Sequence, residues 1–475
     1  MGKLIGRKSE IRELNERYYS DKAELIVVYG RRRVGKTFLV KETFKDKITF
    51  YHTGLSPYDE RAKVGKQEQL SHFYHSLLSY GMQESSCPKD WLQAFYMLES
   101  LLDSLDDGSP QLVFIDELPW MDTAKSDFKS ALDYFWNSWG SAQEDLVLIV
   151  CGSATSWIIS NLLTDKKGFH NRVTRRIHLA PFSLAECEQL FALNDMVMTR
   201  KQMIESYMIL GGIPHYMCLY DSRLSLTQNI NELCFKKHGQ LANEYHNLFY
   251  SLYDKPEKHL AILDALAAHR VGLTRAELSK VKEIGGGSVL TKDLLELEEC
   301  GFIRKYINCT KGEGELFYQL IDPFVLFYIG FIKNKKLDSW NEYINTPGYN
   351  AWRGNAFEIV CINHIEQIKS ALGIRGIETH EFAWRSIEPG GGAQIDLVIK
   401  RKDGVSNLCE MKFTNEEYSI DEDEHRKIEN RLSRFQTMTE TKDAIHVTLI
   451  CGNGYKRSKY SEIVQNVIVG DDLFT

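Results

Sequence analysis

The chain has 475 residues, which is too long for a single hydrophobic core, so two to four domains are expected. A composition of 43% hydrophobic and 26% charged residues is typical of a globular protein, and a net charge of −7 excludes a general electrostatic attraction to nucleic acid. The ten cysteines form no C-x-x-C pair, which predicts reduced thiols in a cytoplasmic protein, and the apolar stretch 323–332 is too short to cross a membrane.

The first informative segment is a phosphate-binding motif. An apolar run at residues 25–29 predicts a buried strand, and the next eight residues have the form G-x4-G-K-T. A strand, a glycine turn and a helix start direct backbone N–H groups and a helix dipole toward one point. We therefore predict that a nucleotide's phosphates bind Gly30, Arg31, Arg32, Arg33, Val34, Gly35, Lys36 and Thr37. Lys36 would reach the β- and γ-phosphates and Thr37 would bind Mg²⁺; the alternative is an ordinary basic turn between two glycines.

Two later apolar runs end in polar residues that suit the same chemistry. Residues 112–115 precede Asp116 and Glu117, and residues 146–151 precede Gly152 and Ser153. Because ligands collect at the carboxyl ends of parallel strands, we predict that Asp116 binds Mg²⁺ and that Glu117 polarises the attacking water. Ser153 would sense the γ-phosphate. One of Arg172, Arg175 and Arg176 would neutralise charge in the transition state, unless this is simply a solvated basic loop.

Two further motifs complete a family resemblance. Residues 4–10, Leu-Ile-Gly-Arg-Lys-Ser-Glu, look like the hhGRExE motif of the STAND branch of AAA+-related ATPases, although Lys8 stands where that family usually has Glu. Residues 211–214, Gly-Gly-Ile-Pro, look like the GxP element of the same branch. The chain resembles the archaeal-type ATPase family. The resemblance implies a sheet in the order 5-1-4-3-2, a helical lid, a winged helix, and an adenine site near Gly6, Arg7 and Pro214.

The middle of the chain has the pattern of a winged helix-turn-helix. The pattern predicts a first helix with a stripe of apolar residues at 260–267 and a second helix that begins at the capping box Thr274–Glu277. A third helix through residues 290–297 and a hairpin around residues 311–315 follow. The third helix has four acids, Asp293, Glu296, Glu298 and Glu299, against one Lys292. Acids repel phosphates, so we favour a packing or subunit-contact role over DNA reading. Contacts to DNA from Arg270, Arg275, Lys280, Lys282 or the wing stay open.

The last part of the chain predicts a helix at residues 353–369, a strand near 377–383, and a hairpin of residues 394–400 and 406–413 about Asp403–Gly404. A basic amphipathic helix around residues 426–435 and a strand at 444–451 complete an αβββαβ order. The expected register places Asp396 opposite residues 410–412, and period two places Glu410 and Lys412 on one face. The acidic run 421–424 is expected to be a solvated loop.

Carboxylates on two adjacent strands and one helix can hold one or two Mg²⁺ ions for phosphodiester cleavage. The pattern resembles the PD-(D/E)xK, restriction-endonuclease-like domain attached to many archaeal-type ATPases. That resemblance implies metal ligands at Glu358, Asp396 and Glu410, with Lys412 positioning the water. The alternative is a decayed nuclease fold that is retained for binding.

The combined prediction is an α/β protein with four segments: a P-loop ATPase core (1–195), a helical lid (196–255), a winged helix (256–335) and a nuclease-like domain (336–475). The first hypothesis is a cytoplasmic ATPase that uses ATP and Mg²⁺ and whose nucleotide state controls a DNA-acting nuclease module. The second is an ATP-dependent switch whose inactive C-terminal fold docks DNA or protein. A small-molecule kinase is a third, poorer alternative. DNA and a second copy of the chain are the candidate macromolecular partners.

Overall fold

The structure is a computed structural model that describes residues 3–56, 64–153, 155–163, 171–253, 255–308, 314–333, 337–344, 346–386 and 392–475. The chain divides into two compact units. The first comprises Met1–Ala180 and Ser251–Tyr253, and the second comprises Pro181–Tyr250 and Asp254–Thr475. Each unit is described by itself. Within the described ranges, no helix is long and apolar enough to cross a lipid bilayer.

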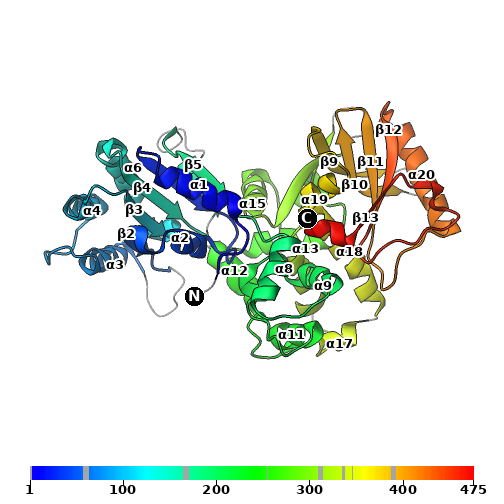
Figure 1. Cartoon of the computed structure of the whole chain (residues 1–475), viewed down its shortest axis with the longest axis horizontal. Helices are drawn as coiled ribbons and strands as arrows, with labels where there is room; N and C mark the ends of the chain where they lie inside the picture. The colour runs from blue at the N-terminus through cyan, green and yellow to red at the C-terminus, as the bar shows by residue number, and fades with distance from the viewer. Residues whose placement is uncertain are drawn as a thin grey trace. The chain divides into compact units, whose positions relative to one another are not determined.

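The first unit contains a parallel sheet, labelled in Figure 1. Its strands lie in the order β2-β3-β4-β1-β5, which confirms the order that the resemblance implied. They are β1 (Glu24–Tyr29), β2 (Ile48–Thr53), β3 (Gln111–Asp116), β4 (Leu146–Cys151) and β5 (Arg175–His178). Strands β3 and β4 are buried along their whole length, as a parallel sheet covered on both faces requires.

Helices surround this sheet. They are α1 (Lys8–Tyr18), α2 (Lys36–Phe44), α3 (Lys66–Ser79), α4 (Trp91–Leu105), α5 (Leu118–Met121), α6 (Phe128–Ser138) and α7 (Thr155–Ile158), with the short η1 (Lys45–Lys47), η2 (Gly140–Ala142) and η3 (Ile159–Leu163). The main core joins aromatic side chains of α3, α4 and α6, among them Phe73, Trp91 and Phe135, to alternate residues of the central strands. Burial of these large rings stabilises the sheet that carries the phosphate motif.

The second unit begins with helices. They are α8 (Leu184–Leu193), α9 (Arg200–Leu210), α10 (Pro214–Met217), α11 (Leu226–Ile230), η5 (Asn231–Phe235) and α12 (Glu244–Leu252). The predicted Gly-Gly-Ile-Pro element forms the junction between α9 and α10. A Cβ atom on Gly212 would lie 2.0 Å from the carbonyl oxygen of Phe182, so only glycine fits there, and Pro214 occupies the first turn of α10.

Three helices and a small antiparallel sheet, the elements from which a winged helix was predicted, lie in the middle of the chain. Helices α13 (Glu257–Ala267), α14 (Arg275–Ser279) and α15 (Gly287–Glu299) accompany a small antiparallel sheet of β6 (Leu273–Thr274), β7 (Ile303–Asn308) and β8 (Glu315–Leu320). The Thr274–Glu277 capping box at the start of α14 is confirmed. Most of the turn between β7 and β8 lies outside the described residues. Strand β7 also contacts β9 of the C-terminal sheet.

The C-terminal part contains a second five-stranded sheet in the order β13-β12-β11-β10-β9. Its strands are β9 (Thr379–Ser386), β10 (Ala393–Arg401), β11 (Val405–Lys412), β12 (Ala444–Cys451) and β13 (Asn466–Val469). The helices of this region are α16 (Pro323–Phe327), η6 (Tyr328–Ile332), α17 (Trp340–Tyr343), α18 (Pro347–Asn363), α19 (Ile365–Ala371), α20 (Glu422–Thr439), η7 (Ser461–Ile463) and η8 (Gly470–Phe474).

The hairpin about Asp403–Gly404 is confirmed, since β10 and β11 pair antiparallel on either side of it. Two expectations for this region are wrong, and one strand is additional. The helix predicted over 353–369 is two helices that meet at His364, and β13 was not predicted. The acidic run 421–424 is not a loop: Asp421 caps α20, and Glu424 lies in its first turn with a mostly buried side chain.

Candidate functional site

The phosphate motif lies between β1 and α2 and has the backbone of a tight loop. Gly30 has φ +138°, and a Cβ atom there would lie 2.4 Å from the carbonyl oxygen of Leu179. Gly35, with φ +95°, is the residue before α2, and Arg33 also has a positive φ of 70°. These left-handed positions curl the loop in front of the helix N-terminus, where backbone N–H groups favour an anion.

Lys36 and Thr37 begin α2. Lys36 contacts the phosphate loop, and Thr37 contacts Asp116, the other predicted Mg²⁺ ligand. The Lys36 ammonium donates to the carbonyl oxygens of Gly30 (2.9 Å) and Arg31 (3.1 Å), so its charge lies over the loop. The Thr37 hydroxyl donates to Oδ2 of Asp116 at 2.7 Å. A hydroxyl oxygen and a carboxylate oxygen at this separation are donors that suit Mg²⁺. Within the motif, Arg31 is buried at 4% exposure, and Arg32, Arg33 and Val34 complete the loop.

Glu117 is held by Ser153 of the neighbouring strand end. Both the backbone N–H and the hydroxyl of Ser153 donate to Oε2 of Glu117, at 2.9 and 2.8 Å. Glu117 has a left-handed backbone (φ 47°), which turns its side chain out of the line of β3. Burial raises the pKa of the Glu117 carboxyl, and nearby Asp116 adds to this, whereas Lys36 and Ser153 lower it. Ser153, expected as a phosphate sensor, thus also orients Glu117 and favours its ionised form.

The other predicted residues of the first unit lie as follows. Arg7 has a left-handed backbone before α1, and its guanidinium donates to the carbonyl oxygen of Ala180 at 2.7 Å; Gly6 precedes it with φ 58°.

The three arginines considered for charge neutralisation all have other partners: Arg172 pairs with Asp133, Arg175 with Glu13, and Arg176 with the Leu163 carbonyl. Pro214, the third adenine candidate, belongs to the second unit.

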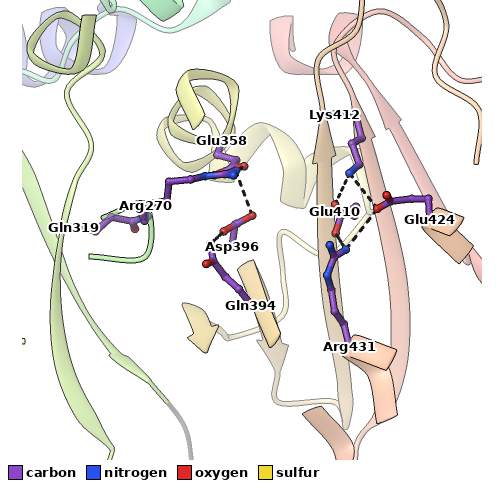
Figure 2. Close-up of polar contacts among 9 residues, drawn as sticks. All are labelled: Arg270, Gln319, Glu358, Gln394, Asp396, Glu410, Lys412, Glu424 and Arg431. Carbon is purple, nitrogen blue, oxygen red and sulfur yellow. Dashed lines mark hydrogen bonds and ion pairs between the residues drawn. The ribbon is translucent and has the colours of Figure 1, made fainter. Parts of the chain in front are cut away.

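The four residues predicted for the nuclease-like site form two pairs and not one cluster. Figure 2 shows two separate groups of contacts. In the first, the Arg270 guanidinium pairs with Glu358 of α18 and lies 3.8 Å from Oδ2 of Asp396, while Gln394 donates to the other oxygen of Asp396. Glu358 is 5% exposed, so Arg270 supplies the positive charge that this buried acid requires.

The second group surrounds Glu410. Its two oxygens contact Lys412 Nζ at 2.8 Å and Arg431 of α20 at 2.6 Å, and Lys412 also lies 3.1 Å from Glu424. Burial opposes ionisation of the Lys412 ammonium, but the carboxylates of Glu410 and Glu424 outweigh it and raise the pKa of Lys412. Arg431 and Glu424, which the sequence analysis did not single out for the site, complete a neutralised cluster.

A bulge in β10 accounts for the separation. Ile395 pairs with Trp384 and Val398 with Phe382, so Asp396 and Leu397 lie opposite the single residue Ala383. A bulge shifts the alternation of side chains by one, which re-aims the residues beside it. The ladder between β10 and β11 runs only as far as Leu397 and Cys409, and Asp396 lies just beyond it. The expected alignment of Asp396 with residues 410–412 therefore does not produce one acid cluster.

Comparison with known proteins agrees with the geometry of the first unit. The family described as "ATPase domain predominantly from Archaea" matches residues 4–219. Two curated proteins of Methanocaldococcus jannaschii are similar to this chain. "Uncharacterized protein MJECL04" is 23% identical over 339 residues, which cover 69% of each chain. "Uncharacterized ATP-binding protein MJ0423" is 46% identical over 44 residues, which cover 9% of this chain and 75% of that one.

Among solved structures, the chain is similar to the Walker-type ATPase PABY2304 of Pyrococcus abyssi. The TM-score is 0.51 with 18% identity, and the alignment covers 69% of this chain and 96% of that one. At this identity the likeness concerns the fold.

Proposed function

We propose that the chain hydrolyses ATP with Mg²⁺, because residues 4–219 match the family of ATPase domains found predominantly in Archaea. The phosphates would lie on the N–H groups of residues 30–37, and Thr37 and Asp116 would hold the metal ion. The observation that carries the proposal is the 2.7 Å contact between these two side chains, next to a loop on whose carbonyl oxygens the Lys36 ammonium lies.

Glu117 is the proposed base for the attacking water. Burial raises the pKa of its carboxyl, which makes it a stronger proton acceptor, and Ser153 fixes the orientation of one oxygen. Lys36 would leave the carbonyl oxygens of the loop for the β- and γ-phosphates, exchanging neutral partners for charged ones. Mg²⁺, when bound, would neutralise phosphate charge.

Steady-state phosphate release tests this assignment. We expect Glu117→Gln to lower kcat by about 10²- to 10⁴-fold while ATP still binds, because only the general base is removed. Lys36→Ala should lose ATP binding itself. Glu144→Gln, an exposed acid on the same unit, is the matched control and should behave like the wild type. A Glu117→Gln protein with the wild-type kcat would exclude Glu117 as the base.

For the C-terminal domain, we propose a docking role for DNA or protein under the control of the nucleotide state. Its predicted acids form two groups, and an arginine neutralises each group. A two-metal nuclease instead needs carboxylates that converge on shared ions about 4 Å apart. The arrangement of Arg270 and Arg431 thus supports the hypothesis of a nuclease fold without cleavage, the second of the two functions considered.

A plasmid-nicking assay in Mg²⁺ separates the two functions. We expect no Mg²⁺-dependent nicking by the wild type, with or without ATP, and no difference for Asp396→Ala or Lys412→Ala. Nicking by the wild type that both substitutions abolish would establish the nuclease hypothesis and overturn the docking role. Neither result would change the expectation for ATP hydrolysis, which depends on residues of the other unit.

A further inference from the structure

Two polar side chains interrupt the apolar contact between α13 and α15 in the winged helix. The buried stripe of α13 consists of His259, Ile262, Leu263 and Leu266, and that of α15 consists of Leu290, Asp293, Leu294 and Leu297. His259 and Asp293 therefore occupy positions at which the helical period calls for apolar residues. Burial of polar groups at such positions is costly unless each of their atoms finds a partner.

The structure brings a third potential ligand to the same point. Nε2 of His259 lies 2.9 Å from Oε2 of Glu296 and 3.8 Å from Oδ1 of Asp293. One ligand atom from each of the three residues lies within 4.8 Å of the other two. Ligands of a tetrahedral zinc ion, each about 2.05 Å from the metal, lie about 3.3 Å apart, so the two measured separations bracket the required value.

A carboxylate oxygen of this group has no hydrogen-bond partner among the described residues. Oδ2 of Asp293 is fully buried and unpaired within the described part of the chain, and the Asp293 side chain is only 9% exposed. A buried carboxylate oxygen without a donor is rare in folded proteins and calls for an explanation such as a bound ion. Residues 292–299 contain four acids and one lysine, and this Lys292 lies 3.6 Å from Oε1 of Glu296, so the segment keeps a net negative charge.

We propose that His259, Asp293 and Glu296 bind a divalent transition-metal cation of the zinc class that joins α13 to α15. One imidazole nitrogen with carboxylate oxygens suits Zn²⁺, Co²⁺ or Mn²⁺, whereas Mg²⁺ and Ca²⁺ prefer oxygen ligands alone. The three side chains are 6%, 9% and 15% exposed, so the site is closed to substrates and its role is structural. The second oxygen of Asp293 or a water molecule would complete four-coordination.

This assignment is independent of the nucleotide site, and sequence spacing gave no sign of it. His259 and the Asp-x-x-Glu pair are far apart in the chain, and no C-x-x-C pair accompanies them. The acids of α15 predict poor DNA binding and a packing or subunit-contact role, and their pattern alone does not indicate a metal site. Packing of two helices places the three residues together, and the spacing of Asp293 and Glu296 by three puts both on one helical face.

Metal titration of the full, untagged chain tests the proposal. After treatment with EDTA and dialysis, the protein is titrated with Zn²⁺ by calorimetry and with Co²⁺ by visible absorption, and Mg²⁺ serves as the comparison ion. We expect about one equivalent of Zn²⁺ bound, a four-coordinate Co²⁺ spectrum that Zn²⁺ abolishes, and a higher melting temperature with Zn²⁺ but not with Mg²⁺.

Asp293→Asn keeps the shape of the side chain and should weaken Zn²⁺ binding by at least about tenfold, as should His259→Gln. Glu298→Gln is the matched control, because Glu298 is on the same helix but pairs with Lys305 at 3.1 Å. It should bind Zn²⁺ like the wild type. No Zn²⁺ binding by the wild type, or equal binding by the Asp293→Asn and wild-type proteins, would overturn the proposal. The Co²⁺ spectrum of the wild type decides the matter even if His259→Gln does not fold.

Discussion

Ser153 and Glu117 form the most consequential pair at the scale of single residues. Two donors of Ser153 converge on one oxygen of Glu117, and charged acceptors strengthen such contacts. The remaining oxygen, Oε1, is the one that a water molecule would approach. The pair thus couples the end of β4 to the proposed base at the end of β3.

We expect Ser153→Ala to lower kcat by about tenfold, since a hydrogen bond to a charged group contributes about 1.5 kcal/mol or more. Loss of the hydroxyl donor raises the pKa of Glu117 further, so the acidic limb of the pH–kcat profile should move to higher pH. Ser153→Thr retains a hydroxyl and should restore most of the activity. An unchanged pH profile in Ser153→Ala would mean that the hydroxyl does not act through Glu117.

His364 is a second residue with a defined chemical state. Its Nε2 accepts the backbone N–H of Leu184 at 2.9 Å, and its Nδ1–H donates to the carbonyl oxygen of Val360 at 2.8 Å, so the ring is neutral. Burial lowers the pKa of His364 to about 4. The ring therefore links the start of α8 to the end of α18 only while it stays unprotonated.

Acid should weaken the second unit through His364. The folded-state pKa lies below the unfolded value of about 6.5, so the stability is full above that value and falls as pH drops through it toward about 4. The pKa difference corresponds to roughly 3 kcal/mol at the acid end. His364→Gln should show a flatter dependence of the unfolding free energy on pH between about 7 and 4. An equal acid loss in both proteins would assign the effect to other groups.

At the scale of elements, the junction of α9 and α10 depends on close backbone packing. The N–H of Phe182 donates to the carbonyl oxygen of Gly212 at 2.6 Å, and Gly211 has a positive φ of 65°. Gly354 lies inside α18 with no atom within 4 Å of its missing Cβ. The two glycines therefore predict opposite responses to the same change.

Gly212→Ala should destabilise the second unit by about 2 kcal/mol or more, because its methyl group would overlap the backbone of Phe182. Gly354→Ala should stabilise it by about 0.5–1 kcal/mol, because alanine has the better helix propensity and the site has room. Thermal unfolding of both variants beside the wild type measures the difference. A neutral Gly212→Ala variant would show that the junction relaxes easily.

At the scale of the whole molecule, the chain has two compact units; among the described residues the first contains one sheet and the second contains two. Units with separate cores commonly unfold as separate cooperative transitions. A ligand that binds only one of them stabilises that unit according to its concentration and affinity. Because the phosphate motif lies in the first unit, a bound nucleotide should raise the unfolding temperature of that unit.

We expect two transitions in scanning calorimetry, of which a non-hydrolysable ATP analogue with Mg²⁺ raises the one that belongs to the first unit. Lys36→Ala should abolish this shift. No shift of either transition in the wild type would contradict nucleotide binding.

The sequence by itself determined the features that depend on neighbouring residues. The phosphate motif, the apolar strands before Asp116 and Ser153, the capping box at Thr274 and the hairpin about Gly404 were all predicted, because glycine turns, helix caps and buried strands are specified by short contiguous patterns. The functions of Gly6, Arg7, Arg172 and Pro214 remain predictions.

Only the tertiary structure decided which distant side chains meet. The bulge in β10 shifted Asp396 from Glu410, α20 brought Arg431 and Glu424 to Lys412, and the packing of α13 on α15 assembled His259, Asp293 and Glu296. The physical reason is that one extra residue in a strand turns the side chains beyond it to the other face of the sheet. The packing of two helices likewise brings together residues that are far apart in the chain. Neither effect leaves a clear sign in the local sequence pattern.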